Sequence, residues 1–374
     1  MRGLGRLRCR ATRAAPTPHP SMTPPATVTW ADAAREQRFA RWIEPLAGAH
    51  RLRLDSLRPA SADASFRRYL RVDGDGTSFV VMDAPPPHED VRAFVHVAGL
   101  IAGAGLHAPK VLAADVEHGF LLLDDLGERP YLQALQAAGA AEAHRLMLDA
   151  IGALVRFQRD VDASTLPAYD AALLQRELAL FPDWCVQREH GVAWGERERA
   201  TWERLCALLV ASALAQPQVA VHRDWMPRNL MVAEPNPGIL DFQDAVRGPV
   251  TYDAASLLRD AFVSWDEERE IDWAVRWWQC ARDAGVFGAH PIGEDFGECW
   301  RALEWMGLQR HLKVLGIFCR LKHRDGKPAY AADLPRFFGY AARVAARYRP
   351  LEPLLGLIEP LAGETLVTTG FTLR

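Results

Sequence analysis

The alternation of apolar and polar residues divides the chain into a strand-rich first part and a helix-rich second part. Residues 30–47 carry apolar side chains at helical spacing, which predicts an opening helix that ends at Pro45. The period then changes to that of strands in RLRLDSLRPA, FRRYLRVD and SFVVMDAP, with GDG as a hairpin turn between the last two. A helix over residues 89–102 and two further strands, KVLAAD and GFLLLDDL, complete a small, mostly antiparallel sheet with one inserted helix.

From Tyr131 onward the pattern is helical, apart from residues 221–244, which predict two short strands or loops around NPG. The sequence DDLGERP breaks the pattern at Asp125–Pro130, and we place a lobe boundary there. The predicted parts are a disordered leader at residues 1–28, an N-terminal lobe at 29–126 and a helical C-terminal lobe at 127–374. The leader is rich in Arg and Pro without Asp or Glu, and we expect Met22 to be the true start.

Composition excludes several classes of protein. With 374 residues, of which 49% are hydrophobic, the chain can bury a substantial core. The net charge of -3 argues against nucleic-acid binding, and no apolar run reaches the roughly 18 residues of a membrane span. The six cysteines are scattered without a CxxC pair, as expected of reduced thiols. We therefore expect a cytoplasmic protein, monomeric, that acts on small molecules.

The stretch VHRDWMPRNLMVAEPNPGILDFQD carries the strongest chemical signal. Phosphoryl transfer needs a carboxylate near the attacking hydroxyl, oxygen ligands for magnesium and cations around the phosphates. Asp224 would orient the hydroxyl and accept its proton, while Asn229 and Asp241 would supply oxygen ligands to Mg²⁺. His222 would brace the loop, and Arg228 is a further candidate within it. Each residue alone would suit a solvated turn, but HxDxxxxN followed by an apolar run and DF is a strong combination.

This stretch resembles the catalytic and metal-binding loops of kinase-like phosphotransferases, specifically the aminoglycoside phosphotransferase (APH) family. DFQD stands where a protein kinase has DFG, no APE motif follows, and GPVTYDAASLLRD comes directly after. The resemblance implies an α+β, bilobal, protein-kinase-like fold, with a small antiparallel-sheet lobe that binds ATP and a larger, mainly helical lobe. It also implies that ATP and Mg²⁺ are the cofactors and that Asp253 supports the catalytic loop.

Longer segments are similar to one branch, the N-acetylmuramate/N-acetylglucosamine anomeric kinases of bacterial cell-wall recycling. These segments are DASFRRYLRV, VVMDAPPPHED, LPAYDAALLQRELALFPDW and GLQRHLKVLGIFCRLKHRDGK, and the resemblance covers about residues 30–350. It implies ATP-dependent phosphorylation of the anomeric hydroxyl of both sugars in peptidoglycan recycling. Two alternatives remain: a kinase of another small alcohol, such as an aminoglycoside or choline, and a nucleotide-binding pseudokinase. An aminoglycoside enzyme would carry an acidic acceptor cleft, whereas this chain offers QRHLKVLG.

The small lobe departs from the kinase pattern where the phosphates bind. The strand SFVVMDAP has Met82 in the place of the usual strand lysine, no lysine precedes Lys110, and PASADASF replaces a Gly-rich loop. Strand alternation puts Arg67 and Arg71 on one face and Arg68 on the other. We expect Arg67 or Arg68 to contact the phosphates, although a solvated strand face is an equal alternative.

The remaining nucleotide contacts are expected from backbone groups. Amides in the loop before Arg67, including those of Ser65 and Phe66, would help to hold the phosphates. The adenine would lie between the lobes against LLLDDLG, where the backbone of Asp124, Asp125 and Leu126 could bind its edge. The same apolar residues would also suit an ordinary buried strand.

The acceptor site is expected on the helix that contains QRHLKVLG. Lys313 stands about one turn after Gln309 and Arg310, so these side chains lie near one face. They could hold an acidic or polar substrate, and the resemblance makes Arg310, His311, Lys313 and Arg228 candidates for the lactyl carboxylate of N-acetylmuramate. A charged, solvent-facing helix is the alternative. Trp184 is a candidate for stacking on a sugar ring.

Overall fold

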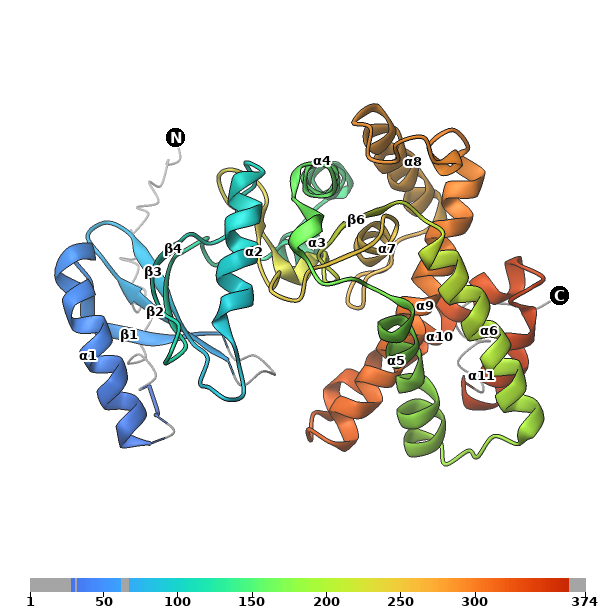
Figure 1. Ribbon diagram of the computed structural model, residues 1–374, viewed down its shortest axis with the longest axis horizontal. Coiled ribbons are helices and arrows are strands. Elements are labelled where there is room, and N and C mark those ends of the chain that lie inside the picture. The colour runs from blue at the N-terminus through green and yellow to red at the C-terminus, as the bar shows by residue number, and fades with distance from the viewer. Residues whose placement is uncertain (1–27, 31, 62–66, 363–374) are drawn as a thin grey trace, which may run out of the picture.

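The computed structural model describes residues 28–30, 32–61 and 67–362. Ser65, Phe66 and most of the predicted leader lie outside the described residues. The chain forms a sheet-containing N-terminal part and a helical C-terminal part, which confirms the expected α+β, bilobal fold (Figure 1). The predicted boundary after residue 126 falls in the segment that connects the last strand of the sheet to the first helix of the second part.

The N-terminal part is a five-stranded antiparallel sheet in the order β1-β2-β3-β5-β4. Helices α1 and α2 pack against its two opposite faces, and α2 lies on the side of the helical lobe (Figure 1). Side chains of β5 alternate between the two faces of the sheet: Phe120 and Leu122 face α1, whereas Leu121 and Leu123 face α2. The elements are α1 (Ala33–His50), β1 (Arg53–Ser61), β2 (Arg68–Asp73), β3 (Ser78–Asp83), α2 (Val91–Gly103), β4 (Val111–Asp115) and β5 (Phe120–Asp124).

The first helix, Ala33–His50, begins and ends later than the sequence predicted. The Asp32 side chain caps the helix by accepting a hydrogen bond from the Arg35 N–H at 2.7 Å. The helix then continues through Pro45 to His50, so the expected end at Pro45 was wrong. Pro45 lies on the exposed side of the helix. The carbonyl that loses its partner there can therefore bind water, which reduces the cost of a proline inside a helix.

The C-terminal part packs its helices around α9, which has 18 buried positions among its 28 residues. The predicted strands around NPG are present as the short hairpin of β7 and β8. The helices are α3 (Tyr131–Ala137), α4 (Ala140–Asp160), α5 (Ala171–Leu180), η2 (Phe181–Glu189, a π-helix), α6 (Glu196–Leu214), α7 (Tyr252–Leu258), α8 (Glu267–Asp283), α9 (Phe296–His323), α10 (Leu334–Arg347) and α11 (Leu355–Ala362). The strands are β6 (Gln218–Val221), β7 (Leu230–Met231), β8 (Gly238–Ile239) and β9 (Val246–Pro249).

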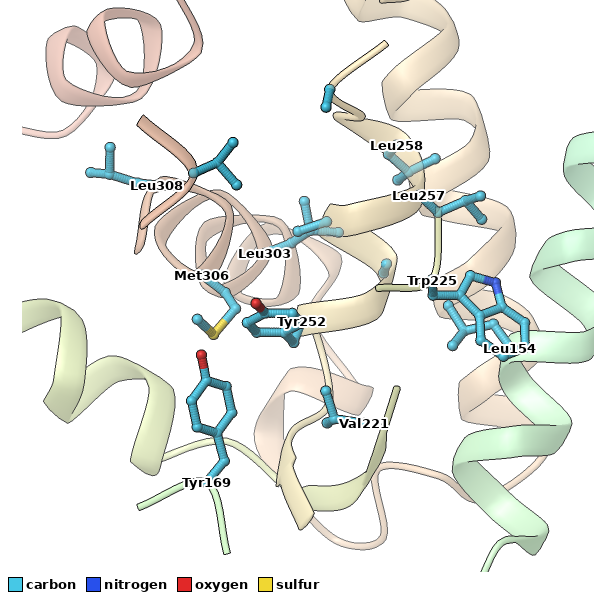
Figure 2. Close-up of a cluster of buried hydrophobic side chains, with 14 of the residues drawn as sticks. Leu154, Tyr169, Val221, Trp225, Tyr252, Leu257, Leu258, Leu303, Met306 and Leu308 are labelled. Carbon is cyan, nitrogen blue, oxygen red and sulfur yellow. The ribbon is translucent and has the colours of Figure 1, made fainter. Parts of the chain in front are cut away.

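A buried hydrophobic cluster anchors the segment that contains the predicted catalytic residues. Figure 2 shows Trp225 beside Leu154 of α4, with Tyr252 between Trp225 and Met306 of α9. Trp225 is fully buried, so it fixes the backbone next to Asp224 against the core. Within the described ranges, no helix is both long and apolar enough to cross a membrane.

Candidate active site

One buried carboxylate, that of Asp253, holds the loop that follows β6. The Asp253 side chain, at the start of α7, accepts hydrogen bonds from the backbone N–H of His222 at 2.7 Å and of Arg223 at 3.0 Å. Asp253 is fully buried, and burial raises the pKa of its carboxyl to about 7 while the two N–H groups act to lower it. Asp253 therefore braces the loop in the manner that the resemblance implied.

The His222 ring connects this loop to the segment that carries Asp241. Its Nε2 lies 3.0 Å from the Leu240 carbonyl oxygen, and the Asp224 backbone N–H donates to Nδ1 at 3.2 Å. A neutral ring with its hydrogen on Nε2 satisfies both contacts. Burial lowers the pKa of His222 to about 4, so the ring is neutral at physiological pH. The predicted bracing role of His222 agrees with these contacts.

Asn229 and Asp241 lie together beside Asp224. The Asn229 Nδ2 donates to the Asp224 carbonyl oxygen at 3.0 Å and lies 3.4 Å from Asp241 Oδ2. Asp241 has a φ of 61° and Arg223 a φ of 75°, in the left-handed region that residues other than glycine seldom occupy. Such conformations cluster at functional sites, where the surroundings impose them, although Arg51 adopts one at the C-terminal cap of α1.

This donor set suits a magnesium ion. The Asn229 Nδ2 is directed at the protein, which leaves its Oδ1 as the ligand atom, and the Asp241 side chain is exposed. The described residues contain no cluster of three His, Cys, Asp or Glu side chains that could enclose a metal. An amide oxygen and one carboxylate fit an ion that takes its other ligands from phosphates and water.

A cavity of about 630 Å³ lies between the two lobes above these residues, a size that suits a nucleotide. Asn229 and Asp241 line it from the helical lobe, and strands β1, β2, β3 and β5, helix α2 and the connection between the lobes line it from the other side. The lining residues of the strands and connection include Tyr69, Arg71, Val80, Leu123, Asp124, Asp125, Leu126 and Gly127.

Hydrogen bonds of two aspartates, Asp124 and Asp125, stabilise the connection between the lobes. Asp124 Oδ1 accepts the Lys110 N–H at 2.6 Å, and the Asp124 N–H donates to the Lys110 carbonyl at 3.2 Å. The Asp125 carboxylate accepts hydrogen bonds from Arg71 at 2.6 Å and Ser78 Oγ at 2.6 Å. In the part of the chain that is described, no hydrogen bond uses the backbone N–H or C=O of Leu126. Leu126 therefore offers the backbone donor and acceptor that the edge of a base requires.

The three arginines of β2 and its approach have different surroundings. Arg68 pairs with the buried Asp83 at 2.6 Å and stacks over Trp30 at 4.1 Å on the α1 face of the sheet. Strand alternation thus turns Arg68 to the face opposite the cavity. The expectation that Arg68 contacts the phosphates is therefore corrected. Arg71 lines the cavity, and Arg67 pairs with Glu89 at 3.1 Å.

Met82 is 1% exposed and packs in the core against α2, so hydrophobic burial accounts for the residue in the place of the usual lysine. Val80, two residues earlier on the same face, lines the cavity. The cavity wall on β3 is thus apolar, and the arginines that line the cavity from the small lobe are Arg58 of β1 and Arg71 of β2.

A second cavity, of about 110 Å³, adjoins the catalytic loop. Arg228 lines both cavities, and Asp224 lines the second. The other lining residues are Met226, Tyr252, Ala261, Phe262, Arg310, Lys313, Val314, Ile317 and Phe318. The structure therefore brings Arg310 and Lys313 of α9 to the same cavity as Asp224, while Gln309, which was expected on the same face, does not line it.

Two candidate substrate residues lie elsewhere. His311 is fully buried and stacks on Tyr340 with ring centroids 4.8 Å apart, because a one-residue step turns it about 100° around α9 from Arg310. Burial lowers the pKa of His311 well below its usual value. Trp184 lies half-buried in η2, packs against the main hydrophobic core and does not line the second cavity. The expectations for His311 and Trp184 are therefore corrected.

Glu177 of α5 was missed by the sequence reasoning. Its buried carboxylate lies 2.8 Å from Lys313 Nζ and 2.5 Å from Arg223 Nη2, and Tyr169 donates a hydrogen bond to it. Burial acts to raise the pKa of Glu177, but Lys313 and Arg223 hold it at about 2. Its cationic partners, Arg223 and Lys313, are 46 or more residues away in sequence, so no local spacing could reveal this ion-paired site.

Comparisons with known proteins agree with this geometry. The profile of the phosphotransferase enzyme family (APH) matches residues 56–290. A Pseudomonas aeruginosa protein named N-acetylmuramate/N-acetylglucosamine kinase is 55% identical over 303 residues, which are 81% of this chain and 88% of that protein. A protein of the same name from Pseudomonas putida is 53% identical over 306 residues, 82% of this chain and 88% of the relative. The ADP-bound aminoglycoside phosphotransferase APH(2'')-Ib superimposes with a TM-score of 0.54 at 14% identity, covering 84% of this chain and 99% of that one, which concerns the fold alone.

Proposed function

Since the chain belongs to the APH phosphotransferase enzyme family, we propose that it transfers the γ-phosphoryl group of ATP to the anomeric hydroxyl of N-acetylmuramate and N-acetylglucosamine. Family membership carries the use of a nucleotide, and the names of the relatives supply the two sugars. The observation that carries the proposal is the meeting of two cavities at the catalytic loop, where Arg228 lines both and Asp224 lines the smaller.

The nucleotide occupies the larger cavity in this proposal. The base lies against the connection between the lobes, where the Leu126 backbone offers its N–H and C=O. Arg67 remains the candidate phosphate contact, because it directly precedes β2 and falls on the strand face of the cavity-lining Tyr69 and Arg71. Its pairing with Glu89 at 3.1 Å would hold the guanidinium in a fixed orientation.

Asn229 and Asp241 would hold Mg²⁺, which when bound neutralises phosphate charge and orients the transferring group. The Asn229 amide is oriented by the Asp224 carbonyl oxygen, and the Asp241 carboxylate lies 3.4 Å from the nitrogen of that amide. Both ligands are thereby fixed relative to Asp224 before substrate binds.

Asp224 orients the acceptor hydroxyl and receives its proton as the phosphoryl group moves. The anomeric hydroxyl suits this role because a hemiacetal OH is more acidic than an ordinary alcohol. The backbone of Asp224 is held by the His222 ring on one side and by the buried Trp225 on the other. These contacts hold the loop through its backbone, so the Asp224 carboxylate is not needed to stabilise the loop and can act on the acceptor.

The charge of the smaller cavity argues against a cationic acceptor. Among the described residues that line it are Arg228, Arg310 and Lys313 but only one carboxylate, that of Asp224. An aminoglycoside or choline would meet like charges there, whereas an N-acetylated sugar is neutral and N-acetylmuramate is an anion. The arrangement of Asp224, Asn229 and Asp241 also disfavours a pseudokinase.

The test is ATP turnover with a panel of acceptors. N-acetylmuramate and N-acetylglucosamine should each stimulate ADP release well above the acceptor-free rate, and glucosamine, choline and an aminoglycoside should not. Stimulation by the cationic acceptors alone would refute the proposal. We further propose that the protein acts in the cytoplasm in peptidoglycan recycling, because its co-substrate is ATP. Its monomeric state remains a prediction.

A further inference from the structure

Arg310 is a buried arginine whose guanidinium no described residue neutralises by direct contact. The residue lies on α9 in the wall of the smaller cavity and is 2% exposed. Its Nη1 is fully shielded and has no hydrogen bond. Within residues 28–30, 32–61 and 67–362, no side chain forms an ion pair with its guanidinium within 4 Å, and no group accepts a hydrogen bond from it. A guanidinium has five N–H donors and stays charged, so an anion that binds at this position would be strongly stabilised.

The other deeply buried arginines are neutralised. Arg259 is fully buried and pairs with Glu270 at 3.1 Å and Glu304 at 2.9 Å. Arg35 is 7% exposed and pairs with Asp83 at 2.5 Å. Both of these structural arginines are thus neutralised by carboxylates. Arg310, in the wall of a cavity, has no such ion pair among the described residues.

The two carboxylates that act electrostatically on Arg310, those of Asp253 and Asp260, both accept backbone hydrogen bonds. Asp253 accepts the N–H groups of the catalytic loop. Asp260 Oδ2 accepts the N–H groups of Phe262 at 2.9 Å and Val263 at 3.1 Å, whereas its Oδ1 is buried without a hydrogen bond among the described residues. Both carboxylates contribute to the field at Arg310 but lie beyond ion-pair distance. They make the buried charge tolerable without satisfying its donors.

The neighbouring cation of the wall is differently placed. Lys313 Nζ lies 2.8 Å from Glu177 Oε1 and donates to the Tyr252 hydroxyl at 3.1 Å. Its charge is thus balanced by Glu177, and two of its three N–H donors are directed at the protein. Arg310 is the better anchor for a bidentate anion because its donors form a planar fork that matches a carboxylate.

We propose that Arg310 binds the lactyl carboxylate of N-acetylmuramate and sets the preference of the enzyme between its two sugars. This inference rests on the proposed function, which places the sugar in the cavity that Arg310 lines. N-acetylglucosamine has a hydroxyl in place of the lactyl ether and brings no anion, so it leaves the guanidinium unpaired. The carboxylate thereby gives N-acetylmuramate a charge-assisted contact that the other sugar lacks.

The variants Arg310→Gln and Arg310→Lys test this assignment. Arg310→Gln should raise the KM for N-acetylmuramate by about 10- to 100-fold, the loss expected for a charged hydrogen bond, while the KM for N-acetylglucosamine changes by less than about threefold. Arg310→Lys should give an intermediate value because an ammonium is not a planar fork. Arg301→Gln is the matched control, since Arg301 lies on the same helix but is exposed and pairs with Glu298.

Thermal unfolding separates binding from a structural role. Arg310→Gln removes an unpaired buried charge, so its melting temperature should not fall below that of the unaltered protein. N-acetylmuramate should raise the melting temperature of the unaltered protein more than that of the variant. A role in the fold through Asp260 predicts the opposite: Arg310→Gln and Asp260→Asn would both lower the melting temperature and weaken both sugars equally. That result would overturn the inference.

Calorimetric titration tests the role of Arg310 independently of whether the protein phosphorylates the sugar. If the unaltered protein phosphorylated neither sugar, the proposed function would fail. Titration of N-acetylmuramate would still decide the role of Arg310. Tighter binding to the unaltered protein than to Arg310→Gln supports the carboxylate contact, and equal binding, or absence of binding to either, rejects it.

Discussion

The position of the catalytic loop depends on Asp253, and its replacement gives the most quantitative test of the architecture. In Asp253→Ala the backbone N–H groups of His222 and Arg223 lose their acceptor, which lies at 2.7 and 3.0 Å in the native structure. His222 and Asp253 are both fully buried, so water cannot easily replace the missing oxygen atoms. Each unmet buried donor costs about 1–3 kcal/mol, and the two together about 2–6 kcal/mol.

The lower half of that range is expected, because the native carboxylate itself is disfavoured by burial. This burial raises the pKa of Asp253 to about 7, and its removal returns part of the desolvation free energy. Asp253→Asn keeps the shape and one acceptor oxygen, so it should lose only about 1–3 kcal/mol. The free energy of unfolding should therefore decrease from the native protein to Asp253→Asn and again to Asp253→Ala.

Urea unfolding and turnover measure this prediction together. Activity should fall in the same order as stability, by about 10²-fold in Asp253→Ala, since a misplaced loop moves Asp224 away from the acceptor. Asp283→Ala is the control: Asp283 is exposed at the end of α8, pairs with Arg282, and its loss should change stability by less than about 0.5 kcal/mol. An Asp253→Ala protein as stable and active as the native one would refute the bracing role.

Three further outcomes are expected. Asp224→Asn should lower turnover by roughly 10²–10⁴-fold with little change in nucleotide affinity, and near-normal turnover would contradict its role as base. Asp241→Ala should abolish magnesium-dependent activity, and recovery at ordinary magnesium concentrations would count against Asp241 as a ligand. His222 has a pKa of about 4 in the fold, against about 6.5 when unfolded, so the unfolded chain binds the proton first as the pH falls. The contribution of His222 to the free energy of unfolding should then decrease by about 3 kcal/mol from pH 6.5 to pH 4, while Asp253, whose pKa is raised to about 7, contributes with the opposite sign. His222→Asn should therefore change the slope of stability against pH by one bound proton, whereas an unchanged slope would exclude His222.

The sequence predicted the parts of the site that depend on short stretches of chain. Asp224, Asn229 and Asp241 lie within one turn-rich stretch whose order resembles known phosphotransferase loops, and the structure places them together. The lobes and the sheet were predicted because strand and helix periods change clearly along the chain. Alternation also separated Arg67 from Arg68, but which face carries α1 depends on packing between distant segments.

The acceptor side could be predicted only in part. Helix α9 is surrounded by other helices, so its buried positions include charged residues and its sequence lacks one clear apolar face. His311 consequently resembled a site residue, although it packs on Tyr340. Glu177 was not identified because Arg223 and Lys313 reach it only through tertiary packing.

The measurement that tests the central claim most directly is phosphorus NMR of the product made from ATP and N-acetylmuramate. Transfer to the anomeric hydroxyl predicts a phosphomonoester doublet coupled to the anomeric proton, formed at a rate that Asp224→Asn strongly reduces. A 6-phosphate signal would contradict the regiochemistry, and release of inorganic phosphate without any sugar phosphate would contradict the assignment as a sugar kinase.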